Sequence, residues 1–234
     1  ISYLLISYFI PIFASKQMNM ETPFLYGRIA ENENFTNRRN ETEFLKKNFK
    51  GLINTVIISP RRWGKTSLVH KVAKLISEEE KNVIICQVDI FNCRTEEEFY
   101  TVFANSLLKS TTTVWEEFVG GVKKYLGRLA PIVSISDATQ TYELSFGIDF
   151  KDSRLSYDEI LDLPQVIAND TKKRIVVCID EFQNINEYEE PLAFQRKLRS
   201  HWQKHTSVCY CLYGSKRHML LNIFNNYGMP FYKF

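Results

Sequence analysis

A group of small, basic and hydroxyl residues, Gly64-Lys65-Thr66-Ser67, follows an apolar, β-branched run. The surrounding sequence nearly matches the phosphate-binding motif G-x-x-x-x-G-K-[ST], except that Ser59 occupies the position of the first glycine. A phosphate bound there would meet backbone N–H groups and the positive end of a helix dipole. Lys65 would reach the β- and γ-phosphates, the Thr66 hydroxyl would ligate Mg²⁺, and Gly64 would let the backbone approach closely.

Ser59 departs from the motif at the turn that leaves the strand. Because the later amides of such a loop hold the phosphates, a small residue followed by proline can still make this turn. We therefore expect the loop to bind nucleotide. The predicted nucleotide-binding residues of the loop are Pro60, Arg61, Arg62, Trp63, Gly64, Lys65, Thr66 and Ser67.

A second apolar run, 174–181, ends in two adjacent carboxylates, Asp180 and Glu181. At the carboxyl end of a strand, Asp180 would share a Mg²⁺ ion with Thr66, and Glu181 would polarise a water for attack on the γ-phosphate. Successive side chains point to opposite faces of an ideal strand, so one carboxylate can serve the metal and the other the water. Ser215, at the end of a third run, would contact the γ-phosphate or the water, or would simply cap a helix.

The elements that must position these residues alternate along the chain. Continuous Val, Ile and Cys runs are typical of strands buried on both faces of a parallel sheet. Four such runs are 55–59, 82–90, 174–181 and 207–215. Helical periodicity follows in the segments 66–81, 95–110 and 191–205, the second of which begins with Thr95 and Glu98 at capping-box spacing. The pattern predicts an α/β fold with a mainly parallel sheet and right-handed crossovers.

Three stretches fit this pattern less well. The segment 130–163 is irregular, and residues 142–150 within it alternate like an exposed strand or hairpin. Residues 1–17 contain about a dozen apolar residues, fewer than the roughly twenty that span a membrane. They also lack the positive charge that opens a secretory signal. We expect residues 1–17 to be an upstream, non-native extension outside the fold, and residues 18–234 to form the domain.

Composition excludes little. Among the 234 residues, 44% are hydrophobic and 24% are charged, which is ordinary for a globular chain long enough to build a core. The net charge of +3 does not by itself support binding to nucleic acid or an anionic membrane. Five cysteines lie mostly in apolar runs without a C-x-x-C pair, which favours reduced thiols in the cytoplasm.

Taken together, these motifs resemble the archaeal and prokaryotic ATPase family within the STAND and AAA+-related P-loop NTPases. The resemblance covers residues 24–234, and its form P-R-R-x-G-K-[ST]-S-L is fairly specific to that group. The segments that carry it are 35–45, 60–68, 87–99, 178–185, 212–220 and 230–234.

The resemblance implies a three-layer fold with an additional strand between the loop strand and the strand ending in Asp180. It implies ATP with Mg²⁺, Lys65 on the phosphates, Thr66 and Asp180 at the metal, Glu181 on the water and Ser215 as a sensor. It places Asn37-Arg38 near the adenine, so Arg38 is a further predicted nucleotide-binding residue. It also implies a helical lid and a winged-helix-like domain beyond Phe234. The predicted activity is slow ATP hydrolysis that drives a conformational switch.

Several alternatives stay open. No N-K-x-D tetrapeptide supports a GTPase, while a nucleotide kinase needs a second substrate pocket. A nucleotide-gated binding module with little hydrolysis would act through a protein partner or self-association. A DNA-associated ATPase similar to origin-recognition initiators is suggested by basic runs, although the net charge does not support it. These runs are 123–124, 172–174 and 196–199.

The remaining candidates have ordinary interpretations. His201 and His205 lack the Glu of H-E-x-x-H, so we expect an exposed helical pair and no zinc site. We expect Phe99, Phe103, Phe182 and Trp202 to lie in the core. One of Arg196, Arg199 and Arg217 could act on the γ-phosphate of a neighbouring subunit, and the sequence does not choose among them.

Overall fold

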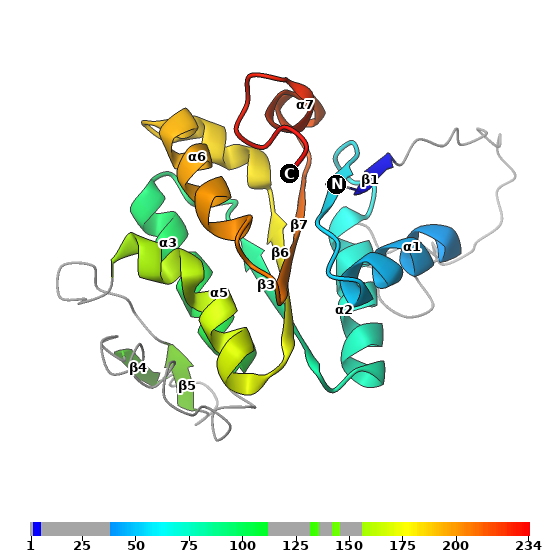
Figure 1. Cartoon of the computed structure of the whole chain (residues 1–234), viewed down its shortest axis with the longest axis vertical. Coiled ribbons are helices and arrows are strands. Elements are labelled where there is room, and N and C mark those ends of the chain that lie inside the picture. The colour runs from blue at the N-terminus through cyan, green and yellow to red at the C-terminus, as the bar shows by residue number, and fades with distance from the viewer. Residues whose placement is uncertain (1, 6–37, 112–131, 136–141, 146–155) are drawn as a thin grey trace, which may run out of the picture.

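The computed structural model describes residues 2–5, 38–111, 132–135, 142–145 and 156–234. At its centre is a five-stranded, wholly parallel sheet with the strand order β1-β2-β7-β6-β3 (Figure 1). The strands are β1 (Ser2–Leu5), β2 (Thr55–Ile58), β3 (Val83–Asp89), β6 (Arg174–Asp180) and β7 (Val208–Gly214). All four runs predicted as buried strands therefore form strands of one sheet.

Helices cover both faces of this sheet. They are α1 (Arg39–Lys50), α2 (Lys65–Glu79), α3 (Glu96–Thr111), α5 (Tyr157–Thr171), α6 (Pro191–Trp202) and α7 (Arg217–Asn225), with a 3₁₀ helix η3 (Phe182–Glu187) after β6. Figure 1 shows α1 and α2 on one side of the sheet and α3, α5 and α6 on the other. Two separate apolar clusters fill the two interfaces, which makes the predicted three-layer α/β fold.

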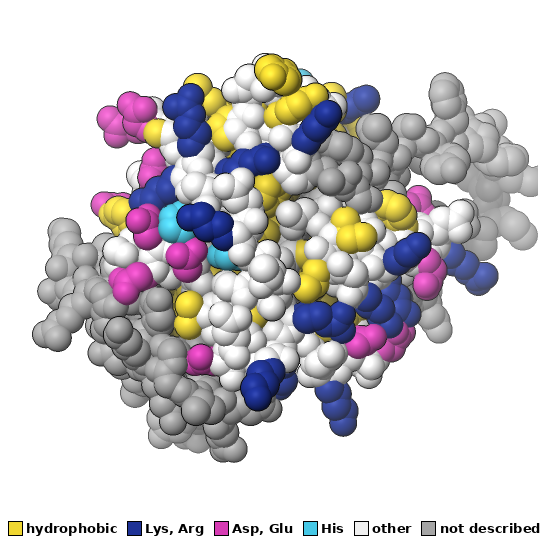
Figure 2. Space-filling view, in the orientation of Figure 1, with side chains coloured by type: hydrophobic (Ala, Val, Ile, Leu, Met, Phe, Trp, Pro, Cys, Tyr) yellow, Lys and Arg dark blue, Asp and Glu magenta, His cyan; other side chains and the backbone are white. Residues whose placement is uncertain are grey.

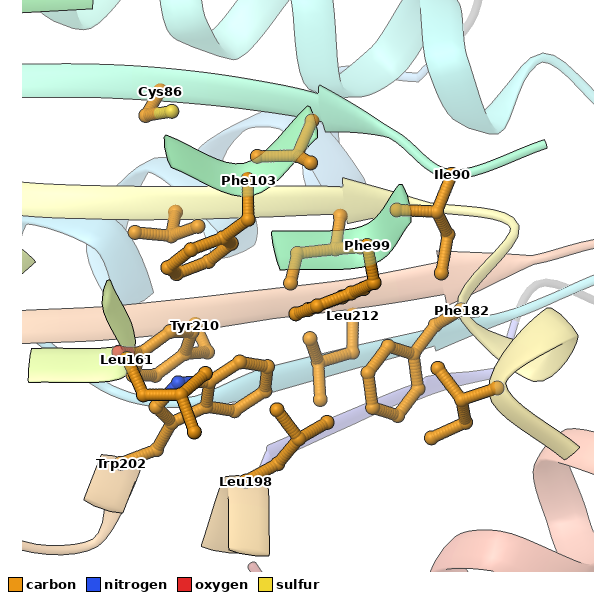
Figure 3. Packing of buried hydrophobic residues seen from close by; sticks show 14 of the residues in the cluster. Cys86, Ile90, Phe99, Phe103, Leu161, Phe182, Leu198, Trp202, Tyr210 and Leu212 are labelled. Carbon is orange, nitrogen blue, oxygen red and sulfur yellow. The ribbon is translucent and has the colours of Figure 1, made fainter. Parts of the chain in front are cut away.

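The larger cluster is rich in aromatic rings. Phe99, Phe103, Phe182 and Trp202 are all buried, as predicted. Trp202 stacks on Tyr210 of β7 with ring centroids 4.2 Å apart, and Figure 3 shows the other rings between the sheet and the helix that carries Trp202. Large aromatic side chains contribute strongly to a core because each removes much apolar surface from water. This packing fixes the strands against α3, α5 and α6.

The topology confirms the additional strand. β7 lies between β2, which leads into the loop, and β6, which ends at Asp180. In the register of the sheet Ile58 pairs with Gly214, and Asp89 pairs with Asp180. Because the strands are parallel, the residues that follow β2, β3, β6 and β7 meet at one edge of the sheet. Ligand sites of open α/β sheets lie at this carboxyl edge.

The segment predicted as irregular contains two ordered parts. β4 (Ile132–Ile135) and β5 (Tyr142–Ser145) form an antiparallel pair, as the alternation in residues 142–150 predicted; residues 146–150 lie outside the described residues. The helix α5 was missed. Ser156 and Glu159 form a capping box at its start, and its interior contains Pro164, a residue that usually interrupts helices.

The N-terminal segment takes part in the sheet. Ser2–Leu5, part of the segment expected to lie outside the fold, pairs in parallel with Thr55–Ile58 of β2. The origin of residues 1–17 as an upstream extension stays a prediction. None of the helices in the described part of the chain is long and apolar enough to cross a membrane.

All five cysteines are free and buried, in agreement with reduced core thiols. Burial raises the pKa of the Cys86 thiol to about 12, so this group stays protonated at neutral pH. Burial also raises the pKa of the Cys93, Cys178 and Cys209 thiols, which makes these groups poor nucleophiles.

Candidate functional site

The loop between β2 and α2 has the backbone of a phosphate cradle. Gly64 adopts a left-handed conformation with φ 66° and precedes the first residue of α2, Lys65. A residue with a side chain is strained in that conformation, and this explains why the motif has a glycine at position 64. The first turn of α2 contains no acidic residue, so its free N–H groups and dipole are available to an anion.

Lys65 lies folded over this loop. Its Nζ donates to the backbone oxygens of Ser59 at 3.2 Å and Pro60 at 3.0 Å. Burial lowers the pKa of Lys65, and the charges of Glu181 and Asp180 oppose that effect. The ammonium therefore has only neutral acceptors in hydrogen-bond contact, and a phosphate would offer it a charged and stronger one.

Thr66 joins the loop to the end of β6. Its Oγ1 donates to Asp180 Oδ2 at 2.7 Å, and the two residues are 114 positions apart. Burial raises the pKa of Asp180 to about 6, while hydrogen bonds from Thr66 and from the backbone N–H of Glu181 act in the opposite direction. A hydroxyl and a buried carboxylate are oxygen ligands that suit Mg²⁺, and a cation would relieve the cost of the buried charge. These residues fit the metal that the sequence predicted.

Glu181 is arranged differently from the expectation. The predicted strand includes Glu181, but β6 ends at Asp180, and Glu181 adopts a left-handed conformation with φ 54°. Its carboxylate accepts hydrogen bonds from Ser215 Oγ at 3.0 Å, from Ser215 N at 3.3 Å and from Gln183 Nε2. The two carboxylates do diverge, because of a turn in the backbone. The structure thus brings both predicted catalytic residues, Glu181 and Ser215, into direct contact.

Gln183 is a site residue that sequence reasoning missed. Its side chain is 1% exposed and lies against Gly214 so closely that a Cβ on Gly214 would come within 1.8 Å of Gln183 Oε1. Only a glycine at the end of β7 leaves room for this amide. The sequence does show an amide residue, Gln183, two positions after the carboxylate pair. Its contact with Gly214, 31 residues further along the chain, could not be read from the sequence.

Arg38 also meets the loop. Its Nη2 donates to the backbone oxygen of Trp63, and its Nη1 is buried without a partner among the described residues. Burial lowers the pKa of Arg38. The guanidinium lies 3.8 Å from the position of a Cβ on Gly64, so Arg38 lies against the loop, while its role in binding nucleotide stays a prediction. Asn37 lies outside the described residues, and the placement of adenine stays a prediction.

Next to Glu181 and Ser215 lies a small open pocket of ≈ 190 Å³ at the carboxyl edge of the sheet. Loop residue Arg61 lines it, together with Arg94 and Lys216. This pocket brings a side chain of the phosphate loop, the carboxylate of Glu181 and residues after β3 and β7 to one place. It is the space in which an attacking water and a terminal phosphate could meet.

The histidine pair is not exposed. The His205 side chain is 3% exposed, with Nδ1 at 2.8 Å from Tyr210 Oη and Nε2 at 3.3 Å from Asp162 Oδ1. His201 Nδ1 lies 2.7 Å from the same Asp162 oxygen. The expectation of an exposed pair is therefore wrong, because the end of α6 packs against α5 and β7. No three His, Cys, Asp or Glu side chains within the described ranges are placed to hold a metal ion.

The three arginines considered for action on a neighbouring subunit lie elsewhere. Arg199 donates to the backbone oxygen of Tyr232 at 3.1 Å and stacks over the ring of Phe234. Arg196 is exposed on α6, and Arg217 begins α7. None of the three lines the pocket beside Glu181.

A parallel α/β sheet with an additional strand, a glycine-lysine-threonine loop at a helix start and an acidic strand end define a P-loop NTPase-type domain. Residues 34–219 match the model of the predicted AAA-ATPase family, described as AAA-ATPase-like. The chain therefore belongs to that family. No curated protein matches the chain.

Three solved archaeal structures have a similar fold. A Walker-type ATPase of Pyrococcus abyssi is similar with a TM-score of 0.57 and 17% identity, over 90% of this chain and 54% of that one. The ORC2 protein of Aeropyrum pernix, in ADPNP-ADP complexes, has a TM-score of 0.51 and 17% identity over 85% of this chain and 45% of its own. Cdc6p of Pyrobaculum aerophilum has a TM-score of 0.53 and 12% identity, over 86% and 44%. The chain thus spans about half the length of these proteins.

Proposed function

We propose that this domain binds ATP with Mg²⁺, hydrolyses it slowly and couples the nucleotide state to a conformational change. The observation that carries the proposal is the 2.7 Å contact between Thr66 Oγ1 and Asp180 Oδ2, which sets two oxygen ligands beside the Lys65 loop. In this assignment the loop and Arg38 bind the nucleotide, and Thr66 with Asp180 holds the metal.

Glu181 is the proposed base for the attacking water, and Ser215 is the proposed sensor of the terminal phosphate. Ser215 and Gln183 donate to the Glu181 carboxylate, so part of its hydrogen-bonding capacity is taken up within the protein. All of these hydrogen bonds end on Glu181 Oε2, so Oε1 is the oxygen that would accept the proton of the attacking water. A change in the hydrogen bonds between Ser215 and Glu181 when the terminal phosphate binds or leaves would move the ends of β6 and β7, and that movement is the proposed switch.

Two variants test the proposal. Lys65→Ala should abolish ATP binding, because the loop loses its only buried ammonium near the phosphates. Glu181→Gln should keep binding and stop hydrolysis, because an amide cannot accept the proton of water. Equilibrium binding of a fluorescent ATP analogue and release of phosphate measure the two effects. Unchanged hydrolysis in the Glu181→Gln protein would remove Glu181 from its role.

A nucleotide-gated binding module with little hydrolysis is a second candidate, supported by the hydrogen bonds that Ser215 and Gln183 donate to one oxygen of the Glu181 carboxylate. Turnover of the protein with and without partner proteins separates the two, since rapid turnover by the chain alone contradicts a gated module. Self-association, membership of the STAND group and a cytoplasmic location remain predictions.

A DNA-associated ATPase has less support. Arg174, in one basic run, donates to Lys50 O and Glu80, and Lys197, in another, pairs with Asp158. Figure 2 shows basic and acidic side chains interspersed on the face that it draws. The run 123–124 lies outside the described residues. A steep salt dependence of binding to duplex DNA would favour this alternative.

A further inference from the structure

The pocket beside Glu181 contains more positive than negative charge. Three cationic side chains line it, Arg61, Arg94 and Lys216, together with the carboxylates of Glu181 and Glu187. Counted as formal charges, these groups sum to +1.

The cations of the pocket differ in what they contact. Glu187 accepts from Lys216 at 2.5 Å and from Arg94 at 3.3 Å, so both of these cations are paired with the same carboxylate. Glu181 is bound by the neutral donors Ser215 and Gln183. Arg61 is exposed and forms no hydrogen bond or ion pair with another described residue. Arg61 is therefore the one cation lining this pocket that has no acidic partner among the described residues.

Arg61 is also anchored in the phosphate loop itself. It lies two residues after Ser59 and four before Lys65. The Lys65 ammonium donates a hydrogen bond to the backbone oxygen of Ser59, so the two ends of this segment are in contact. A side chain that begins in this loop and lines the same pocket as Glu181 spans the space between the loop and the proposed base. A guanidinium there is always charged and presents a planar fork of donors that matches phosphate oxygens.

We propose that Arg61 is a catalytic residue that stabilises the γ-phosphate during transfer from within the same chain. This inference rests on the proposed function of the site. In the step, the oxygen of water bonds to the γ-phosphorus, and its proton passes to the Glu181 carboxylate. The bond from that phosphorus to the bridging oxygen breaks, and its electron pair leaves with ADP. Arg61 offsets the negative charge of the γ-phosphate oxygens as this happens.

The assignment has a consequence for assembly. An arginine supplied by a neighbouring subunit makes hydrolysis depend on protein concentration, since two chains must meet. With Arg61 in the same chain, turnover per molecule is independent of protein concentration. The three arginines that could act across an interface, at positions 196, 199 and 217, are then not required for hydrolysis.

The test compares binding of ADP alone with binding of ADP plus aluminium fluoride, which mimics the γ-phosphate during transfer. Arg61→Ala should leave the affinity for ADP and Mg²⁺ within about twofold, because Arg61 lines the pocket beside Glu181, where the proposal puts the γ-phosphate that ADP lacks. It should weaken trapping of the ADP–aluminium fluoride complex by at least about tenfold and slow turnover by about 10³-fold. Arg196→Ala, an exposed arginine on α6, serves as the charge-matched control and should change neither quantity.

Each result separates this inference from the proposed function. Wild-type protein that traps the fluoride complex equally well over a hundredfold dilution, together with an Arg61→Ala protein that does not trap it, supports the inference. Equal trapping by wild type and Arg61→Ala overturns the inference and leaves the ATPase function standing. Loss of trapping in Arg196→Ala or on dilution also overturns it. A wild-type chain that binds neither ADP nor ATP overturns both.

Discussion

Thr66 and Asp180 are joined by a hydrogen bond of 2.7 Å although β7 separates the strand before the loop from the strand that ends at Asp180. Thr66 can reach across because it lies in the first turn of α2, whose start is above the carboxyl edge of the sheet. The contact places a hydroxyl oxygen and a carboxylate oxygen side by side. Burial raises the pKa of this carboxyl to about 6, so its protonation state changes close to physiological pH.

Binding of nucleotide with Mg²⁺ should therefore depend on pH. The metal needs the ionised carboxylate, and Asp180 becomes protonated as the pH falls through about 6. We expect the affinity for Mg²⁺ with ATP to fall between pH 7 and pH 5, while the affinity for ATP in the presence of EDTA changes less. Titration calorimetry at both pH values measures the difference. An affinity for the magnesium complex that is equal at pH 5 and pH 7 would contradict this role.

Asp180→Asn should stabilise the chain in the absence of nucleotide. The folded-state pKa of about 6 lies above the ordinary value of 3.8, so ionised Asp180 opposes folding. The stability that protonation provides is present below pH 3.8 and is lost as the pH rises through about 6. By linkage the loss is about 3 kcal/mol at most, and Asn avoids it at pH 7.

Urea denaturation at pH 7 and pH 5 tests whether ionised Asp180 lowers the free energy of unfolding. Wild type should gain stability on going to pH 5 relative to Asp180→Asn. Glu78→Gln, which removes an exposed carboxylate of α2, is the matched control and should follow the wild type. An Asp180→Asn protein less stable than wild type at pH 7 would mean that the hydrogen bond from Thr66 outweighs the cost of burial.

Gly214→Ala should destabilise the end of β7. Its Cβ would come within 1.8 Å of Gln183 Oε1 and 3.3 Å of Glu181 Cα, so the buried amide must move. We expect a loss of about 1–3 kcal/mol in the free energy of unfolding, together with altered hydrolysis, since Gln183 contacts Glu181. Gly228→Ala is the control, because its Cβ meets only Asn226 Oδ1 at 3.8 Å. Equal stability of the two variants would show that Gln183 relocates freely.

The sequence predicted the parts of the fold that are encoded locally. Buried β-branched runs gave all four strands that surround the site, and the glycine before Lys65 marked the helix start. Helix α5 was missed because Pro164 argues against a helix, and tertiary packing overrides that local preference. Gln183 and the buried position of His205 depend on contacts with residues distant in the sequence, Gly214 in one case and Asp162 in the other. No local pattern carries such information.

Ser59→Gly restores the first glycine of the phosphate-binding motif and should not improve the loop. Ser59 is 1% exposed and is not among the residues with positive φ, so its backbone does not need the freedom of glycine. It holds Lys65 through its carbonyl, which glycine also provides. We expect ATP affinity within about twofold of wild type, and a loss of about 0.5–1 kcal/mol in stability from the added freedom of the unfolded chain.

Ser59→Ala is the control for the hydroxyl, whose Oγ is buried without a partner in the described structure, and should be neutral or stabilising. A large gain in ATP affinity in Ser59→Gly alone would show that serine distorts the turn.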